Sequence, residues 1–131
     1  MIFLCGIAGI YCNKPLTKEL SKSFEKIMVS LESRGRDAFG FYIYPRNILF
    51  KKKGCVTDFV ESDNRKDKRK KHHFYQRFVG QQTILGHCRA TTQGTENNNE
   101  NNHPFETANF VMAHNGMIGN DKSLKYNKSL D

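Results

Sequence analysis

The apolar run at the start of the chain is the feature that most constrains the fold. Residues 3–11 read Phe-Leu-Cys-Gly-Ile-Ala-Gly-Ile-Tyr, with no charged side chain. A short continuous apolar run bounded by polar residues is typical of a strand that is buried on both faces. Gly6 and Gly9 inside the run indicate that another group approaches the backbone closely. We therefore expect a buried strand over residues 3–11.

An amphipathic helix is predicted directly after this strand. Thr17 suits the N-cap position, and Glu19 falls in the first turn. We expect the helix to end near Ser33 or Gly35. Its apolar face repeats at helical spacing and consists of Leu20, Phe24, Ile27, Met28 and Leu31.

The rest of the chain favours strands over helices. Residues 39–44 and 48–50 flank a Pro-Arg-Asn turn and predict a hairpin. Residues 74–79 suggest a short helix, residues 83–88 and 109–113 suggest strands, and the Asn-rich residues 95–102 suggest a loop. A chain of 131 residues has the size of one domain. This order of elements predicts a single layered α+β domain.

The net charge of +8 is concentrated in one segment. Residues 51–77 hold ten Lys or Arg and four Asp or Glu, a net charge of +6. We interpret residues 55–77 as a basic, solvated insertion, because charge runs are usually exposed. Nucleic-acid binding by residues 65–77, with phosphate contacts and base stacking, is a less favoured alternative.

The four cysteines and the apolar runs indicate the compartment. Cys5, Cys12, Cys55 and Cys88 form no CxxC pair, which favours a reducing environment. No run approaches the roughly 20 apolar residues of a membrane span, and the start has no basic region typical of a signal peptide. We predict a cytoplasmic protein with no membrane association. The histidines and cysteines lack zinc-ligand spacing, so neither a metal nor a cofactor is expected.

Four segments carry more polar and glycine residues than packing requires. They are Cys-Gly-Ile-Ala-Gly-Ile at residues 5–10, Arg-Gly-Arg-Asp-Ala-Phe-Gly at 34–40, Gly-His-Cys-Arg-Ala-Thr-Thr-Gln-Gly at 86–94 and Ala-His-Asn-Gly-Met-Ile-Gly-Asn at 113–120. The segment Asn-His-Pro-Phe at 102–105 lies between the last two. Taken singly, each has an ordinary explanation. A buried cysteine is usually a small hydrophobe, and Asn-Gly usually forms a type I′ turn.

Together and in this order, the four segments resemble the glutaminase domain of the class II glutamine amidotransferases. Members of this family are N-terminal-nucleophile hydrolases with a cysteine nucleophile. The resemblance extends from Cys5 to Asn120 and implies an α/β/β/α sandwich. It also implies L-glutamine as the substrate and a separate synthetase or acceptor domain that receives ammonia.

The resemblance implies a role for each matching residue. Cys5 would attack the side-chain amide of glutamine with its own α-amine as the base, since an α-amine has a pKa of roughly 7.7–8.0. Asn115 and Gly116 would form the oxyanion hole. Arg89 would hold the α-carboxylate of the substrate, with Thr92 beside it and Arg34 near the nucleophile.

The chain departs from the family pattern at both ends. Cys5 is not the first residue, so residues 1–4 are expected to be a propeptide that must be removed. The family's acidic residue for the substrate α-amine lies well after His-Asn-Gly, whereas only residues 121–131 follow Asn120 here. The sandwich is therefore expected to be incomplete at the C-terminus. A catalytically inactive binding module with this fold is the alternative to an active glutaminase.

Overall fold

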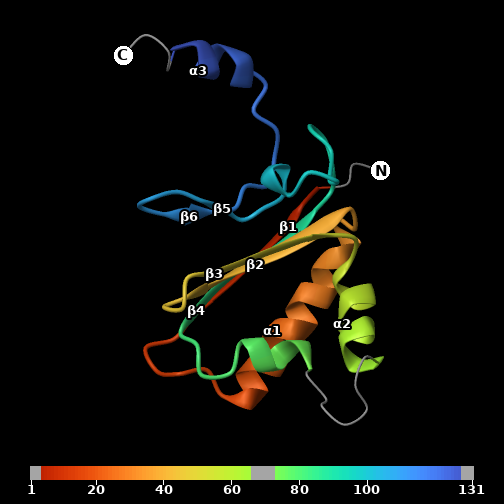
Figure 1. The fold of residues 1–131 in the computed structure, drawn as a ribbon, viewed down its shortest axis with the longest axis vertical. Coiled ribbons are helices and arrows are strands. Elements are labelled where there is room, and N and C mark those ends of the chain that lie inside the picture. Colours follow the sequence, from red (N-terminus) through yellow and green to blue (C-terminus); the bar gives the residue numbers. More distant parts are fainter. Residues whose placement is uncertain (1–3, 66–72, 128–131) are drawn as a thin grey trace.

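A four-stranded antiparallel sheet with helices on one face forms the body of the protein. The structure is a computed structural model, and it describes residues 4–65 and 73–127. The sheet contains β1 (Gly6–Tyr11), β2 (Ala38–Tyr44), β3 (Ile48–Lys53) and β4 (Thr83–Arg89) in the order β1-β4-β2-β3. The helices α1 (Lys18–Ser30) and α2 (Val56–Arg65) pack on one side of it (Figure 1). This arrangement confirms the α+β class.

Short elements complete the fold. The 3-10 helices are η1 (Leu31–Ser33), η2 (Phe74–Arg77) and η3 (Asn99–Asn101). The strands β5 (Phe105–Glu106) and β6 (Val111–Met112) form a small hairpin, and α3 (Asp121–Asn127) follows it. The hairpin and α3 lie on the side of the sheet opposite α1 and α2 (Figure 1). In residues 4–65 and 73–127, no helix is both long and apolar enough to cross a membrane.

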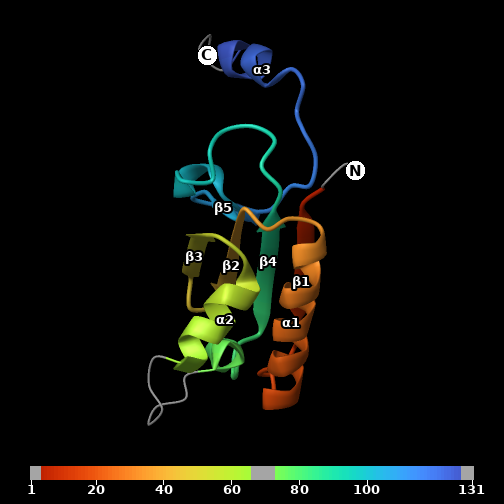
Figure 2. The same cartoon turned by 90° about the vertical axis from the view of Figure 1, so that its right-hand side faces the viewer.

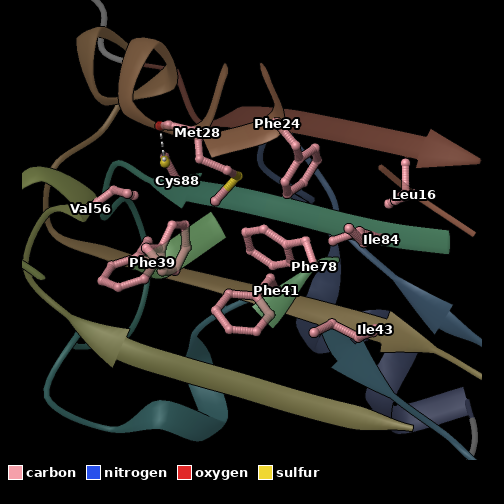
Figure 3. Close-up of a cluster of buried hydrophobic side chains, with 11 residues drawn as sticks. Leu16, Phe24, Met28, Phe39, Phe41, Ile43, Val56, Phe78, Ile84 and Cys88 are labelled. Atoms are coloured by element: carbon pink, nitrogen blue, oxygen red, sulfur yellow. Dashed lines mark hydrogen bonds between the residues drawn. The ribbon is translucent and has the colours of Figure 1, made fainter. Parts of the chain in front are cut away.

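Aromatic side chains between the sheet and the helices fill the core. The ring centroid of Phe78 lies 5.2 Å from that of Phe41 and 5.1 Å from that of Phe24, and both pairs have edge-to-face geometry (Figure 3). Such pairs stabilise a core beyond the burial of their area. The expected helix after residue 17 is confirmed: Oγ1 of Thr17 accepts from the Leu20 amide, and η1 extends α1 to Ser33.

The expectation that the first strand is buried on both faces is wrong. β1 lies at the edge of the sheet, and only its inner side chains face α1 and η1. Its outward side chains Ile7 and Tyr11 are 40% and 77% exposed. The close approach expected at the glycines occurs at Gly6, where an added Cβ would lie 2.9 Å from Leu31, but not at Gly9.

Two further expectations need correction. Residues 55–65 contain α2, a helix that was not expected, and its Val56 belongs to the core. Asn115-Gly116 does not form a type I′ turn, because that turn needs positive φ at both residues and Asn115 does not have it. Most of the basic run, residues 66–72, and residues 1–3 of the expected propeptide lie outside the described part of the chain.

Candidate functional site

The antiparallel register brings three strand ends to one place. β4 lies between β1 and β2, with Gly6 opposite Cys88 and Ala38 opposite Arg89. The start of β1, the start of β2 and the end of β4 therefore meet at the same end of the sheet. Figure 2 shows the start of β1 and the loop that follows β4 together there. Cys5 immediately precedes β1 at this end.

The backbone of Cys5 is held by neighbouring loops. Cys5 is 9% exposed, and its thiol donates to the Ala90 carbonyl at 3.6 Å. Nε of Arg34 donates to the Cys5 carbonyl at 3.1 Å. Gly35 lets the loop that carries Arg34 lie close to the end of β4, because an added Cβ there would lie 2.3 Å from the Ala90 nitrogen. Asp37 closes the loop by accepting from the Thr91 amide at 2.7 Å.

A pocket of about 570 Å³ opens beside Cys5. Four of the six predicted site residues line it, namely Cys5, Arg89, Thr92 and Gly116. Arg34 contacts the Cys5 carbonyl but does not line the pocket. Asn115 is exposed and does not line it either. The topology thus gathers residues from all four sequence segments around one thiol.

The guanidinium of Arg89 is a buried cation whose hydrogen-bond partners are neutral. Arg89 is only 5% exposed. Nη1 donates to Oδ1 of Asn102 at 2.7 Å, and Nη2 donates to the carbonyl of Gln93. Within the described ranges no carboxylate forms an ion pair with this guanidinium. Burying a charge without a counter-charge is unfavourable, so the pocket favours an anionic group next to Arg89.

Two histidines lie against each other on the outer face of the sheet, and one of them, His103, lines the pocket. The rings of His87 and His103 are 4.2 Å apart, and Nε2 of His87 lies 3.2 Å from the carbonyl of His114. Because a carbonyl only accepts, Nε2 of His87 carries the proton in this contact. Burial lowers the pKa of His87 to about 4 and that of His103 to about 3. Both rings are therefore neutral at pH 7, and His87 holds the backbone just before Asn115.

Gly40 on β2 leaves room for the segment that carries His103. An added Cβ at Gly40 would lie 2.2 Å from the His103 carbonyl and 2.7 Å from the Phe50 carbonyl. Gly40 thus lets the segment that carries His103 lie directly on β2. In the described residues, no group of three or more His, Cys, Asp or Glu is arranged to hold a metal ion.

A larger cavity, of about 840 Å³, lies on the other side of Ala90. Ala90 lines both cavities. The carboxylate of Glu32 in the larger cavity is engaged by the amide and the hydroxyl of Thr57. The lining of the larger cavity contains no cysteine, so the smaller cavity beside Cys5 is the better candidate for nucleophilic chemistry.

Sequence reasoning missed several residues of the pocket. His103 and His114 line it, together with the carboxylate-bearing Glu100 and Asp121. Asn102 was also missed, although it is fully buried and contacts Arg89 directly. The histidines and Asn102 stand within the noted segments, which was a usable signal, but nothing in the local pattern indicates that Asn102 contacts Arg89.

Comparisons with known proteins give relatives over almost the whole chain. It is 29% identical over 127 residues to 7-cyano-7-deazaguanine synthase from Sulfolobus acidocaldarius, covering 93% of this chain and 26% of that protein. It is 34% identical over 127 residues to glutamine–fructose-6-phosphate aminotransferase (isomerizing) from Staphylococcus aureus, covering 93% of this chain and 18% of that one. The enzyme of the same name from Streptococcus pyogenes is 33% identical over 125 residues, with the same coverage of 93% and 18%.

These relatives support a glutamine amidotransferase-like relation at modest identity. The chain spans about a quarter or less of the length of the curated relatives it matches. No protein-family model matches the chain, and no solved structure matches it significantly.

Proposed function

We propose that this chain is a glutaminase of the glutamine amidotransferase type, which hydrolyses L-glutamine to glutamate and ammonia. The observation that carries the proposal is the pairing of the Cys5 thiol with the buried, uncompensated cation of Arg89 in one pocket. A thiol can attack an amide carbonyl, and a guanidinium binds a carboxylate through two parallel hydrogen bonds. An amino acid with a side-chain amide offers both groups.

In the proposed mechanism, the Cys5 sulfur attacks the carboxamide carbon of glutamine. The thiol proton passes through the α-amine of Cys5 to the leaving nitrogen, the carbon–nitrogen bond breaks, and ammonia departs. A thioester between Cys5 and the glutamyl group remains. Water then adds to the thioester carbonyl, the carbon–sulfur bond breaks, and glutamate and the free thiol are released. The α-amine acts as a base only after residues 1–4 have been removed.

The other predicted residues stabilise the substrate and the transition state in this proposal. The Gly116 amide and the Asn115 carboxamide donate to the oxyanion, for which Asn115 turns from solvent towards the pocket. Thr92 assists Arg89 at the α-carboxylate, and Arg34 fixes the Cys5 backbone. An α/β/β/α sandwich, a cytoplasmic location and a separate acceptor of ammonia belong to the same proposal.

A glutamate-release assay with matched cysteine variants tests the proposal. Cys5 and Cys12 flank the two ends of β1, and Cys12 is remote from the pocket. We expect Cys5→Ala to abolish glutamate release and Cys12→Ala to retain it. Intact-mass spectrometry of the active protein should show a chain that begins at Cys5. Glutamate release by a chain that keeps residues 1–4 contradicts the proposed base.

The same assay separates the alternative. A chain confirmed to begin at Cys5 that binds L-glutamine but releases no glutamate is a non-catalytic binding module. No observation in the described residues favours nucleic-acid binding, since most of the basic run lies outside them.

A further inference from the structure

We propose that Asn102 is a positioning residue for Arg89. Its neutral carboxamide fixes the guanidinium at the wall of the Cys5 pocket while leaving the positive charge available to an anionic group of the substrate. The inference rests on the proposed function for its substrate, but the geometry that carries it lies within the chain.

The orientation of the Asn102 carboxamide follows from its partners. Arg89 can only donate, so the atom 2.7 Å from Nη1 must be the oxygen Oδ1. Nδ2 then donates to the Glu96 carbonyl at 2.9 Å and to Oδ1 of Asn99 at 3.0 Å. Both ends of the carboxamide are therefore engaged, and Asn102 is fully buried.

The loop that holds Asn102 is itself anchored to the sheet. Asn99 donates from Nδ2 to the Lys51 carbonyl of β3 at 3.3 Å. Nζ of Lys53, also on β3, donates to Oδ1 of Asn97 at 2.7 Å. The Asn-rich segment is thus a folded element that supports Asn102, and through it the Arg89 side chain, from the neighbouring strand.

The neutrality of Asn102 is the second part of the inference. A carboxylate at this position would have nearly the same shape and would also accept from Nη1. It would form an ion pair with Arg89, and the guanidinium would then have its counter-charge inside the protein. An asparagine holds the same nitrogen without satisfying its charge, which suits a site that must bind a carboxylate from outside.

Two substitutions distinguish this role from simple loop anchoring. Asn102→Asp and Asn102→Ala both lose the two hydrogen bonds donated by Nδ2. They differ in what they offer Arg89, which is a negative charge in the first and nothing in the second. Loop anchoring predicts equal effects, whereas the proposed role predicts that the Asp variant binds substrate far more weakly than the Ala variant.

The binding experiment uses the full chain with Cys5→Ala as the parent, so that L-glutamine binds without reacting. Asn102→Asp and Asn102→Ala are each combined with this parent, and calorimetry measures their dissociation constants for L-glutamine. We expect the constant of the Asp variant to be at least about tenfold higher than that of the Ala variant, because the Asp variant loses the charge-assisted contact between Arg89 and the substrate. Asn98→Asp is the matched control, because it adds the same charge to the same loop and keeps the oxygen that accepts from the Glu100 amide. It should bind like the parent.

A turnover experiment complements the titration. In the chain with Cys5 intact, we expect Asn102→Asp to raise KM at least about tenfold and to change kcat less than threefold, because the altered contact serves binding in both ground and transition states. A merely structural defect would lower the active fraction and hence kcat. Equal binding by the Asp and Ala variants, or unchanged binding by the Asp variant, overturns the inference.

The outcomes separate this inference from the proposed function. A parent that binds L-glutamine while the unsubstituted chain releases no glutamate overturns the glutaminase proposal alone. A parent that binds no L-glutamine overturns both. Should Asn102→Asp fail to fold, Asn102→Ala decides: we expect at least threefold weaker binding than in the parent, and unchanged binding refutes the positioning role.

Discussion

Replacement of Gly40 by alanine tests the close contact between β2 and the segment that carries His103. An added Cβ would lie 2.2 Å from the His103 carbonyl and 2.7 Å from the Phe50 carbonyl, and both are backbone atoms. Neither can move away as the end of a flexible side chain could. Overpacking of this kind destabilises by about 1–3 kcal/mol, and two backbone neighbours place Gly40→Ala at the upper end.

Gly9→Ala is the matched control on the same outer face of the sheet. The nearest atom to its added Cβ is the Ile84 carbonyl oxygen at 3.8 Å, an ordinary contact. Alanine restricts the unfolded chain equally in both variants and stabilises by about 0.4–1 kcal/mol where no clash opposes it. We therefore expect Gly40→Ala to lower the free energy of unfolding by about 2 kcal/mol and Gly9→Ala to raise it slightly.

Urea denaturation monitored by circular dichroism measures both variants. With a slope of about 1.5 kcal/mol per molar urea, the two midpoints should differ by roughly 2 M. Gly40→Ala should also weaken L-glutamine binding, because His103 lines the pocket. Equal midpoints for the two variants would refute the claim that the glycine at position 40 is needed for close packing.

Three further perturbations follow from the core, a helix cap and a buried histidine. Phe78→Ala should lower the free energy of unfolding by about 3–5 kcal/mol in denaturant titrations, whereas the exposed Phe110→Ala should change it by less than about 0.5 kcal/mol. Thr17→Ala removes the cap on the Leu20 amide and should lower the free energy of unfolding by about 1 kcal/mol, and an unchanged value contradicts the cap. The pKa of His87 falls from 6.5 to about 4 on folding, so between pH 4 and 6.5 the unfolded chain binds more protons than the folded chain. The stability contributed by His87 should be fully present above pH 6.5 and decrease by about 1.4 kcal/mol per pH unit as the pH falls towards 4. His103, whose pKa is lowered to about 3, should steepen the loss, and a flat profile over this range contradicts the neutral rings.

The fold was predictable where the signal was local. The apolar run, the Thr17 cap and the hairpin of β2 and β3 each depend on neighbouring residues, and each element is present. The burial of β1 was not predictable in this way, because hydrophobicity does not reveal that β1 is an edge strand with helices on one side only. The helix α2 was missed because its few apolar residues, such as Val56, are outnumbered by polar ones.

The candidate site shows the same division. The four segments were identifiable from the sequence, and three of them line the pocket while the fourth contacts Cys5 through Arg34. Their convergence depends on the strand order, which places β4 between β1 and β2. Asn102 could not be distinguished from Asn101 or Asn99, because all three are asparagines in one polar run. Burial and the hydrogen bond from Arg89 separate them, and that bond joins residues 13 positions apart along the chain.

The position of β1 also makes the two edges of the sheet unequal. At the β3 edge, Lys51, Lys52 and Lys53 place consecutive positive charges along the strand, a common protection against the addition of another strand. At the β1 edge, the strand reads Gly-Ile-Ala-Gly-Ile-Tyr and carries no charge. Of the two edges of this sheet, only the β3 edge therefore carries charges that oppose edge-to-edge association.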